Sequence, residues 1–368
     1  MINNISKIKI KEFPYGKFRI FEKYFCYLTN DNKIILKKNN SIIFEYSFLS
    51  INLLRLTKDF LIFSNDVNEV KLYDIQKNKL EEIEFNKENI TLNTFQNFVS
   101  SNWIIYKQLN LLEVNAGIYN IEKRNIRFVK NDFYPYLILK DKIFGYLHNT
   151  SVLLYDDNGV LIWQYNLEKK HNWFQRANYI NEPDIEKQAE VIKFLGVYKN
   201  ELWLVLNSGA LLALNINTGL ESRYIKEGKM IVGESDFEDF NGYFGYDTVL
   251  DEESGHIFNL NKHFYIEYNL KSENDYFHSY SFKETSQKHQ LNLNYVGGFD
   301  KEYIYSYEGS DNNRFAIFCR TKKEIIWSSE IEEVKGKFPA IRDLQYGADK
   351  IYVLDHNNTL HIFEREKN

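Results

Sequence analysis

A short pattern of strands and turns recurs along the whole chain, and this repeat limits the fold more than any other feature. In residues 60–85, an apolar run at 60–64 is followed by a polar turn, a second run at 70–75, another turn, and a third run at 80–85 in which apolar and acidic residues alternate. Short alternating runs separated by polar turns indicate antiparallel strands. The repeating unit is therefore a meander of three strands.

The same meander is found eight times, and its middle strands can be aligned. Most of their separations lie near the roughly 40–50 residues of a four-stranded propeller blade. The aligned residues are Leu36, Tyr73, Tyr119, Tyr155, Leu214, Tyr268, Phe318 and Phe363. Apolar stretches such as 51–56, 136–139, 191–197 and 291–296 precede the meanders and can supply a fourth, innermost strand. We predict an all-β chain, a single β-propeller domain over residues 1–368. It has eight four-stranded antiparallel blades, or seven if one degenerate unit is an insertion.

The last unit, residues 351–363, is one strand short. Near the start of the chain, Ile8 and Ile10 alternate with Lys7, Lys9 and Lys11. This segment can supply the missing outer strand, so that the first and last segments of the chain pair and close the ring. Lysines on such an edge strand discourage pairing with other chains.

Composition excludes several classes of protein. The chain has 368 residues, 46 basic and 51 acidic side chains, and a net charge of −5. One packed core rarely exceeds about 250–300 residues, which also favours repetition of a small unit. The acidic balance without a basic run argues against a nucleic-acid partner, and no apolar stretch is long enough to span a membrane. The two cysteines, Cys26 and Cys319, lie far apart and are expected to be free thiols. Without a secretory signal at the start, we expect a cytoplasmic monomer.

Some units also resemble the quinoprotein-like β-propeller repeat, whose pattern is A-x-D-x-x-T-G-x-x-x-W. The best copy is residues 213–219, Ala-Leu-Asn-Ile-Asn-Thr-Gly, with Arg223 in the tryptophan position. Trp163 and Trp327 stand at that position in two other units, and the resemblance implies that they pack between neighbouring blades. The family's enzymes use a quinone cofactor, a calcium site and a vicinal cysteine pair. Because the chain lacks adjacent cysteines, we predict no cofactor and no metal.

No catalytic motif is present. His256 and His263 flank a strand without a third ligand nearby, so they are expected to be surface histidines. The polar turn at 65–69 lacks the glycine and spacing of a calcium loop. The acidic residues at 234–239 have no visible partner for acid–base chemistry.

The long insertions between units are more informative. They fall at residues 167–190, 227–240, 283–290 and 332–338, and in a four-stranded blade such links emerge on one face. Functional residues are often found on loops held by a rigid scaffold. We predict that these insertions form one binding face.

Two of these insertions carry candidate partner-binding residues. Aromatic residues and arginine are enriched at interface anchors, and an acidic segment can speed association with a basic partner. Trp173 and Phe174 could instead pack their loop onto the ring, and residues 184–193 could form one or two helical turns after Pro183. The candidates are His171, Trp173, Phe174, Arg176, Asp236, Phe237 and Glu238.

The leading hypothesis is a non-enzymatic propeller that binds another protein through the insertion face, for example an inhibitor or immunity-type protein. The alternative is an enzyme or ligand-binding propeller with a site at the mouth of the central channel. Its mark would be charged side chains that converge from inner strands, and the candidates are Asp247, Arg342 and Asp343. A scaffold subunit of a larger assembly is a third hypothesis.

Overall fold

The structure is a computed structural model. It describes residues 2–9, 18–48, 51–65, 69–83, 90–92, 103–109, 114–121, 123, 125–131, 133–175, 184–232, 244–309, 312–332, 340–347 and 349–365. The chain divides into two compact units. Unit one comprises Met1–Lys87, Leu260–His263 and Phe282–Asn368, and unit two comprises Glu88–Asn259 and Phe264–Ser281. The assignment of residues 1–368 to a single domain therefore stays a prediction.

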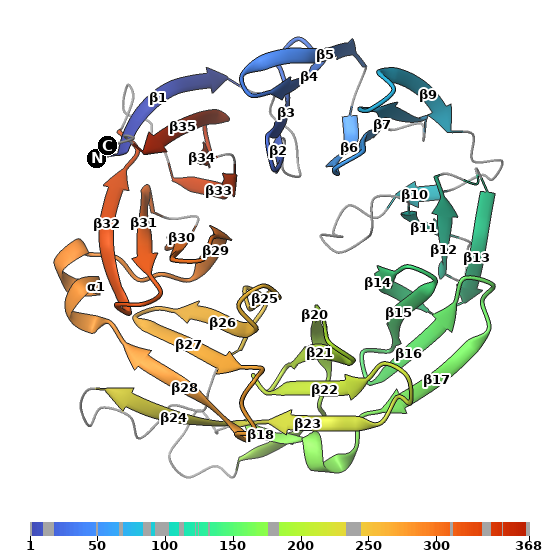
Figure 1. The fold of residues 1–368 in the computed structure, drawn as a ribbon, viewed down its shortest axis with the longest axis vertical. Helices are drawn as coiled ribbons and strands as arrows, with labels where there is room; N and C mark the ends of the chain where they lie inside the picture. Colours follow the sequence, from blue (N-terminus) through green and yellow to red (C-terminus); the bar gives the residue numbers. More distant parts are fainter. Residues whose placement is uncertain are drawn as a thin grey trace. The chain divides into compact units, whose positions relative to one another are not determined.

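Unit one contains four sheets of four strands among its described residues (Figure 1). Chain order and sheet order agree in three of them, and the fourth takes its last strand from the start of the chain. The first two are β2 (Phe18–Phe21), β3 (Tyr24–Leu28), β4 (Lys33–Lys38) and β5 (Ser41–Ser47), then β6 (Ile51–Leu56), β7 (Phe60–Asn65), β8 (Val70–Asp74) and β9 (Lys79–Ile83). The other two are β29 (Tyr295–Phe299), β30 (Tyr303–Tyr307), β31 (Arg314–Cys319) and β32 (Glu324–Glu330), then β33 (Ile341–Gly347), β34 (Lys350–Asp355), β35 (Thr359–Arg365) and β1 (Ile2–Lys9).

Unit two contains three sheets of four strands, one of five and a separate hairpin among its described residues. The four-stranded sheets are β10 (Ile90–Leu92), β11 (Trp103–Leu109), β12 (Val114–Asn120) and β13 (Asn125–Asn131), β14 (Tyr134–Leu139), β15 (Lys142–Leu147), β16 (Ser151–Asp156) and β17 (Leu161–Asn166), and β20 (Val191–Tyr198), β21 (Glu201–Leu206), β22 (Leu211–Asn215) and β23 (Glu221–Ile225). The five-stranded sheet is β24 (Glu227–Val232), β25 (Val249–Asp251), β26 (His256–Asn261), β27 (Phe264–Asn269) and β28 (Tyr276–Ser281), and the hairpin is β18 (Trp173–Gln175) with β19 (Ile185–Lys187).

The eight sheets confirm the predicted blades of four antiparallel strands, with one addition. In the five-stranded sheet, β24 lies parallel to β28 as an extra outer strand. Buried apolar residues on the middle strands form clusters that join consecutive sheets of a unit. The apolar residues that alternate along the strands thus pack the faces of neighbouring sheets against each other.

The pairing of the first and last segments of the chain is confirmed. β1 runs antiparallel to β35 in the sheet ordered β1-β35-β34-β33 (Figure 1). Ile8 packs against a buried cluster that includes Phe18, Leu360 and Ile362, whereas the neighbouring Lys7 is exposed. Ile10, the second residue of the predicted alternation, lies outside the described residues.

The acidic or amide residue of the repeat has a local role at the end of the third strand in four of the sheets. The Asn215 Oδ1 accepts hydrogen bonds from the backbone N–H groups of Asn217 and Thr218, at 2.9 and 3.2 Å. Asp74, Asp156 and Asn269 accept equivalent bonds from the residues that follow them. Such Asx turns reverse the chain tightly. Asx turns need no proline, of which the chain has only 4.

A second recurring feature holds neighbouring sheets together. In five sheets the third and fourth strands share a bulge, and one equivalent residue of the fourth strand lies beside it. These residues are Phe44, Phe128, Trp163, Arg223 and Trp327. Trp163 extends to the following sheet, where its Nε1 donates to the carbonyl oxygen of Ile216 at 3.0 Å. A Cβ atom added at Gly219 would lie 2.7 Å from the Trp163 ring, and the backbone there has φ +71°. The predicted packing of Trp163 between blades is confirmed.

Arg223 takes the place of the tryptophan and makes the same connection with hydrogen bonds. Its Nη1 donates to the carbonyl oxygens of Leu270 and Ser272, at 3.2 and 3.0 Å, in the turn after β27. Its Nε lies 3.2 Å from the Glu201 carboxylate, and the guanidinium lies over the Trp203 ring, 5.6 Å from its centroid. Leu270 follows β27 as Ile216 follows β22, so Arg223 and Trp163 bind equivalent carbonyl groups.

Two insertions differ from the expected projecting loops. Residues 283–290 contain the helix α1 (Lys283–His289), whose Ser286 is buried and whose His289 Nδ1 lies 2.8 Å from the Ser328 Oγ in β32. This insertion therefore lies along its own sheet. Residues 227–232 form β24, while 233–240 and 333–338 lie outside the described residues. The prediction of one insertion face stays a prediction. In the part of the chain that the structure describes, no helix has the length and apolarity to cross a membrane.

We expect the β1 pairing to contribute to stability. The variant Ile8→Asn should unfold at a lower urea concentration, because a partly buried apolar side chain contributes about 1–2 kcal/mol. Deletion of residues 1–9 should have a larger effect, because β35 then becomes an unpaired edge. The control is Lys7→Asn, on the opposite face of the same strand. Equal unfolding midpoints for Ile8→Asn and Lys7→Asn would contradict the pairing.

We also expect Arg223 to be needed between its two sheets. The variant Arg223→Ala leaves buried carbonyl groups of the 270–272 turn without a donor, which should lower the free energy of unfolding by about 1–3 kcal/mol. The matched control is Lys226→Ala, an exposed cation three residues away. Urea unfolding followed by tryptophan fluorescence measures both, and an Arg223→Ala midpoint equal to that of the control refutes the role.

Candidate functional site

The segment after β17 is fixed at its base by a buried histidine. The 3-10 helix η1 (Lys169–His171) places the His171 ring in the interior of unit two, with no exposed surface. The backbone N–H of Glu168 donates to its Nδ1 at 2.9 Å, and its Nε2 lies 3.0 Å from the Glu221 carboxylate. The ring also meets Tyr224 edge-on, with centroids 4.8 Å apart. His171 thereby connects the insertion to the first residue of β23.

Glu221 is the centre of this group. Besides His171, its Oε2 accepts from the Tyr165 hydroxyl at 2.5 Å and from the Lys170 Nζ at 3.0 Å. Burial alone would raise the pKa of Glu221, but the hydrogen bonds from Tyr165, Lys170 and His171 outweigh it and lower that pKa. Burial and the neighbouring carboxylate raise the pKa of Tyr165. Glu221 is therefore charged at neutral pH and holds three donors together.

Two asparagines fix the other end of the same segment. The Asn172 Nδ2 donates to the Glu186 Oε1 at 2.9 Å, and its Oδ1 accepts from the backbone N–H of Ala189 at 3.2 Å. The Asn207 side chain bonds the backbone of Gln188 and Glu190 at 3.0 and 3.1 Å. The two strands that leave this base, β18 and β19, pair in register. The start of the insertion is thus held by Glu221 of β23, and its end by Asn207, the residue after β21.

The hairpin above this base exposes large apolar side chains. Phe174 is 63% exposed and Ile185 is 55% exposed, and they lie on opposite faces of the hairpin because Phe174 pairs with Glu186 and Ile185 with Gln175. Trp173, which pairs with Lys187, is half-buried on the same face as Ile185. The hairpin therefore exposes a large apolar side chain on each of its faces. A rigid base with an apolar end is the geometry of a docking element.

The predicted partner-binding residues have different positions in the structure. Phe174 is exposed and Trp173 is half-buried, so Phe174 does not pack the loop down. His171 is fully buried, so its ring is part of the base and not of the surface. Residues 184–187 contain β19 and not helical turns, because Ile185–Lys187 pair with β18. Arg176, Asp236, Phe237 and Glu238 lie outside the described residues.

The residues proposed for a channel mouth are divided between the units, and each has neighbours within its own unit. On β33, burial raises the pKa of Asp343, which accepts from the Gln345 Nε2 at 2.9 Å and lies near Arg19. Arg342 precedes it, with Nη1 3.5 Å from the Asn358 Oδ1. Arg19, Arg342 and Asp343 show that charged residues do gather on inner strands of unit one.

Asp247 belongs to unit two and lies near a lysine of β20. The Lys193 Nζ donates to the carbonyl oxygens of Tyr246 and Thr248, at 2.5 and 2.7 Å. Burial disfavours the charged form of both groups: it lowers the pKa of Lys193 to about 8 and raises the pKa of Asp247. The pair ties the 246–248 segment to an inner strand and leaves Tyr246 exposed.

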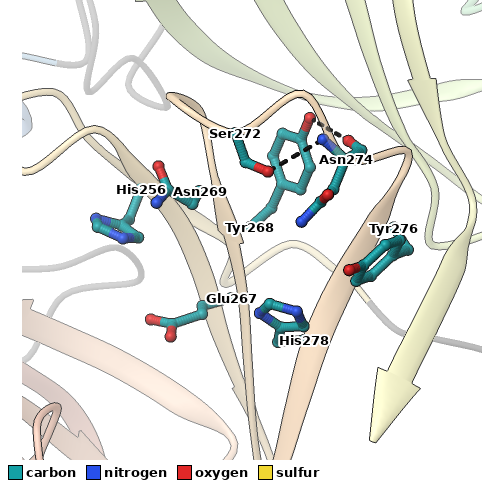
Figure 2. A pocket seen from close by; sticks show the side chains of 8 residues that line it. All are labelled: His256, Glu267, Tyr268, Asn269, Ser272, Asn274, Tyr276 and His278. Atoms are coloured by element: carbon teal, nitrogen blue, oxygen red, sulfur yellow. Dashed lines mark hydrogen bonds between the residues drawn. The ribbon is translucent and has the colours of Figure 1, made fainter. Parts of the chain in front are cut away.

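The five-stranded sheet of unit two contains a small polar cavity that the sequence did not indicate (Figure 2). Glu267 and His278 face each other on paired strands, and the Glu267 Oε2 also accepts from the Tyr265 hydroxyl at 2.8 Å. The cavity measures about 140 Å³, which is the volume of four or five water molecules at roughly 30 Å³ each. Drug-sized ligands need about 300–1,000 Å³. Its lining residues are His256, Glu267, Tyr268, Asn269, Ser272, Asn274, Tyr276 and His278.

A second, wider hollow of about 400 Å³ lies beside this cavity and shares Asn274 with it. It is lined by Ser222–Ile225 of β23 and by Glu273–Asp275, so the Arg223 connection forms part of its wall. Among the described residues, no three His, Cys, Asp or Glu side chains are placed to hold a metal ion. The two hollows therefore offer polar surface without a metal-binding geometry.

Comparison with known proteins identifies the fold. No protein-family model and no curated protein matches the chain. Among solved structures, the chain is similar to the C-terminal WD40 domain of Sif2, with a TM-score of 0.62, 10% identity and coverage of 100% of this chain and 99% of that one. It is similar to the computationally designed Ika8 protein, with a TM-score of 0.59, 10% identity and coverage of 97% and 99%. It is also similar to BamB from Moraxella catarrhalis, with a TM-score of 0.51, 11% identity and coverage of 99% and 100%. The chain is a β-propeller of four-stranded antiparallel blades, and at such identities the likeness concerns the fold alone.

The Glu221 group gives a pH-dependent prediction. Because the pKa of Glu221 is lowered in the folded chain, its stabilisation is complete at neutral pH and is lost as the pH falls below the ordinary glutamate value of 4.5. The variant Glu221→Gln should melt below the wild type at pH 7, and the difference should shrink toward about pH 3.5. Thermal melts across that range measure it. The control Glu253→Gln, at an exposed site, should match the wild type at every pH; a constant Glu221→Gln difference would argue against the assignment.

Proposed function

We propose that the chain is a non-enzymatic, protein-binding propeller whose partner docks on the β18–β19 hairpin. The observation that carries this proposal is a hairpin that exposes Phe174 on one face and Ile185 on the other, above a base fixed by His171, Asn172 and Asn207, so that the partner must clasp both faces. A fixed base lowers the entropy that a partner must remove on binding. Large apolar side chains supply most of the energy at interface centres.

The finer form of the proposal is an inhibitor or immunity-type protein in the cytoplasm. Blocking another protein needs a rigid surface and no catalytic group, and propellers provide such surfaces through their loops. Cys26 and Cys319 are both buried free thiols, which suits a reducing compartment. The turn at residues 215–219 and the packing of Trp163 support a quinoprotein-like origin of the repeat, without its cofactor.

A small-ligand site remains the second candidate, and the Asp343–Arg19 and Asp247–Lys193 neighbours favour it. Partly buried charges on inner strands are costly unless they serve binding or structure. Arg19→Met would separate these roles: a ligand site predicts loss of ligand-induced stabilisation in a metabolite screen, and a structural pair predicts only a lower melting temperature.

The docking hairpin is tested by a double variant, Phe174→Ala with Ile185→Ala. The tagged wild type should retain a protein in stoichiometric amount from native lysate, and the purified partner should bind the double variant at least about 100-fold more weakly, the effect of two anchor residues. The matched control is Ile42→Ala, an equally exposed apolar residue of unit one. Equal affinity of the double variant and the wild type would reject the hairpin as the site.

A further inference from the structure

The outer edge of β28 is covered by an added strand of the same chain. β23 ends at Ile225, and β24 begins two residues later on the edge of the next sheet in the sequence (Figure 1). β24 pairs with β28 in parallel, from Glu227 opposite Tyr276 onward. Every other strand pair whose register is described is antiparallel, and the repeat needs only four strands. β24 is therefore an addition to a sheet that is complete without it.

The covered edge lacks the usual protection of an edge strand. β28 has the sequence Tyr-Phe-His-Ser-Tyr-Ser, without a formal charge, whereas β5, β9, β23 and β32 each carry charged side chains. Unprotected edges accept further strands, and charged residues normally prevent this. β17 is also uncharged, but it ends its sheet without an added strand. Strand addition has thus occurred at β28 and not at the comparable edge of β17.

The fit of β24 depends on two residues. Gly228 lies opposite Phe277, and a Cβ atom there would be 2.5 Å from the Phe277 ring, so a larger residue would have to displace this buried ring. Lys229 places its Nζ 3.5 Å from the centroid of the Tyr276 ring, within the range of a cation–π contact. The exposed carboxylates of Glu273 and Asp275 precede this ring. The edge therefore selects a glycine followed by a basic residue.

The contacts that keep β24 paired with β28 are weak. The ladder has an irregularity between Met230 and Val232, and parallel pairing is slightly weaker per residue than antiparallel pairing. Gly228 contributes no side chain, and Lys229 makes a contact worth about 0.5–1 kcal/mol at an exposed site. Such a strand can exchange with a competing one that presents the same two residues.

From these observations we infer that the outer edge of β28 is a binding site for an extended peptide segment of another protein, with glycine followed by lysine or arginine, and that β24 is the chain's own occupant of this site. Binding is by addition of a strand to the sheet. This site is distinct from the β18–β19 hairpin and does not depend on it.

The experiment uses a fluorescent peptide with the sequence of residues 226–232, Lys-Glu-Gly-Lys-Met-Ile-Val, and the full-length chain. Two variants weaken the internal strand: Gly228→Val, through the Phe277 ring, and the milder Lys229→Glu. Fluorescence anisotropy should show binding to both variants at least about 10-fold tighter than to the wild type, because the internal strand competes in the wild type. A peptide with glycine changed to valine should bind neither.

Three outcomes overturn the inference. The first is absence of peptide binding to Lys229→Glu, whose melting temperature shows that it is folded. The second is that the peptide binds the wild type as tightly as it binds the two weakened variants. Binding to the control variant Lys226→Glu, which leaves β24 intact, as tight as to the weakened variants counts as the same outcome. Hydrogen exchange of the β28 amides gives an independent readout. If these amides in the wild type exchange only through global unfolding, β24 never leaves the edge of β28, and the inference is refuted.

Discussion

The connection between neighbouring sheets is the contact on which the rest of this structure depends. A single four-stranded sheet cannot bury both of its faces by itself. Trp163 and Arg223 reach from the fourth strand of one sheet to the carbonyl groups of the next, and Gly219 gives the tryptophan room. A repeat of small sheets becomes stable only through such nearest-neighbour contacts. The motif at residues 213–219 therefore acts in packing between sheets.

Arg223 in the tryptophan position changes the polarity of the space between the two sheets that it joins. An indole fills the space between two sheets, whereas a guanidinium satisfies carbonyl groups and leaves polar walls. The wider hollow, the Figure 2 cavity and the β24 strand all lie at the sheets that Arg223 joins. Glu201 and the Trp203 ring balance the charge of Arg223. Arg223 thus adds polar contacts to a junction that is also packed by apolar and aromatic side chains, among them Trp203 and Tyr268.

Much of the fold could be predicted because it is determined by local sequence. Alternating apolar residues define the strands, Asx residues such as Asn215 define the turns, and Ile8 could be matched to the incomplete last unit. The site depended on distant partners. His171 was predicted to be a partner-binding residue because no sequence signal shows that it meets Glu221, fifty positions further on. The parallel strand β24 and the helix α1 were read as loops, since their pairing is decided by neighbouring sheets. Among the aligned middle strands, Leu36 was one residue out of register, because Lys37 holds the place of Tyr155 beside the bulge.

The separation between stability and binding follows from this arrangement. The inter-sheet contacts use the fourth strands and the turns after the third, whereas the β18–β19 hairpin lies between two sheets in the sequence and adds no strand to either. Its base is fixed by His171 and Asn172, so the exposed residues Phe174 and Ile185 can change without loss of a blade contact. A partner that recognises this chain can therefore select the hairpin residues independently of the fold, which is the property that a repeat scaffold with a grafted binding element requires.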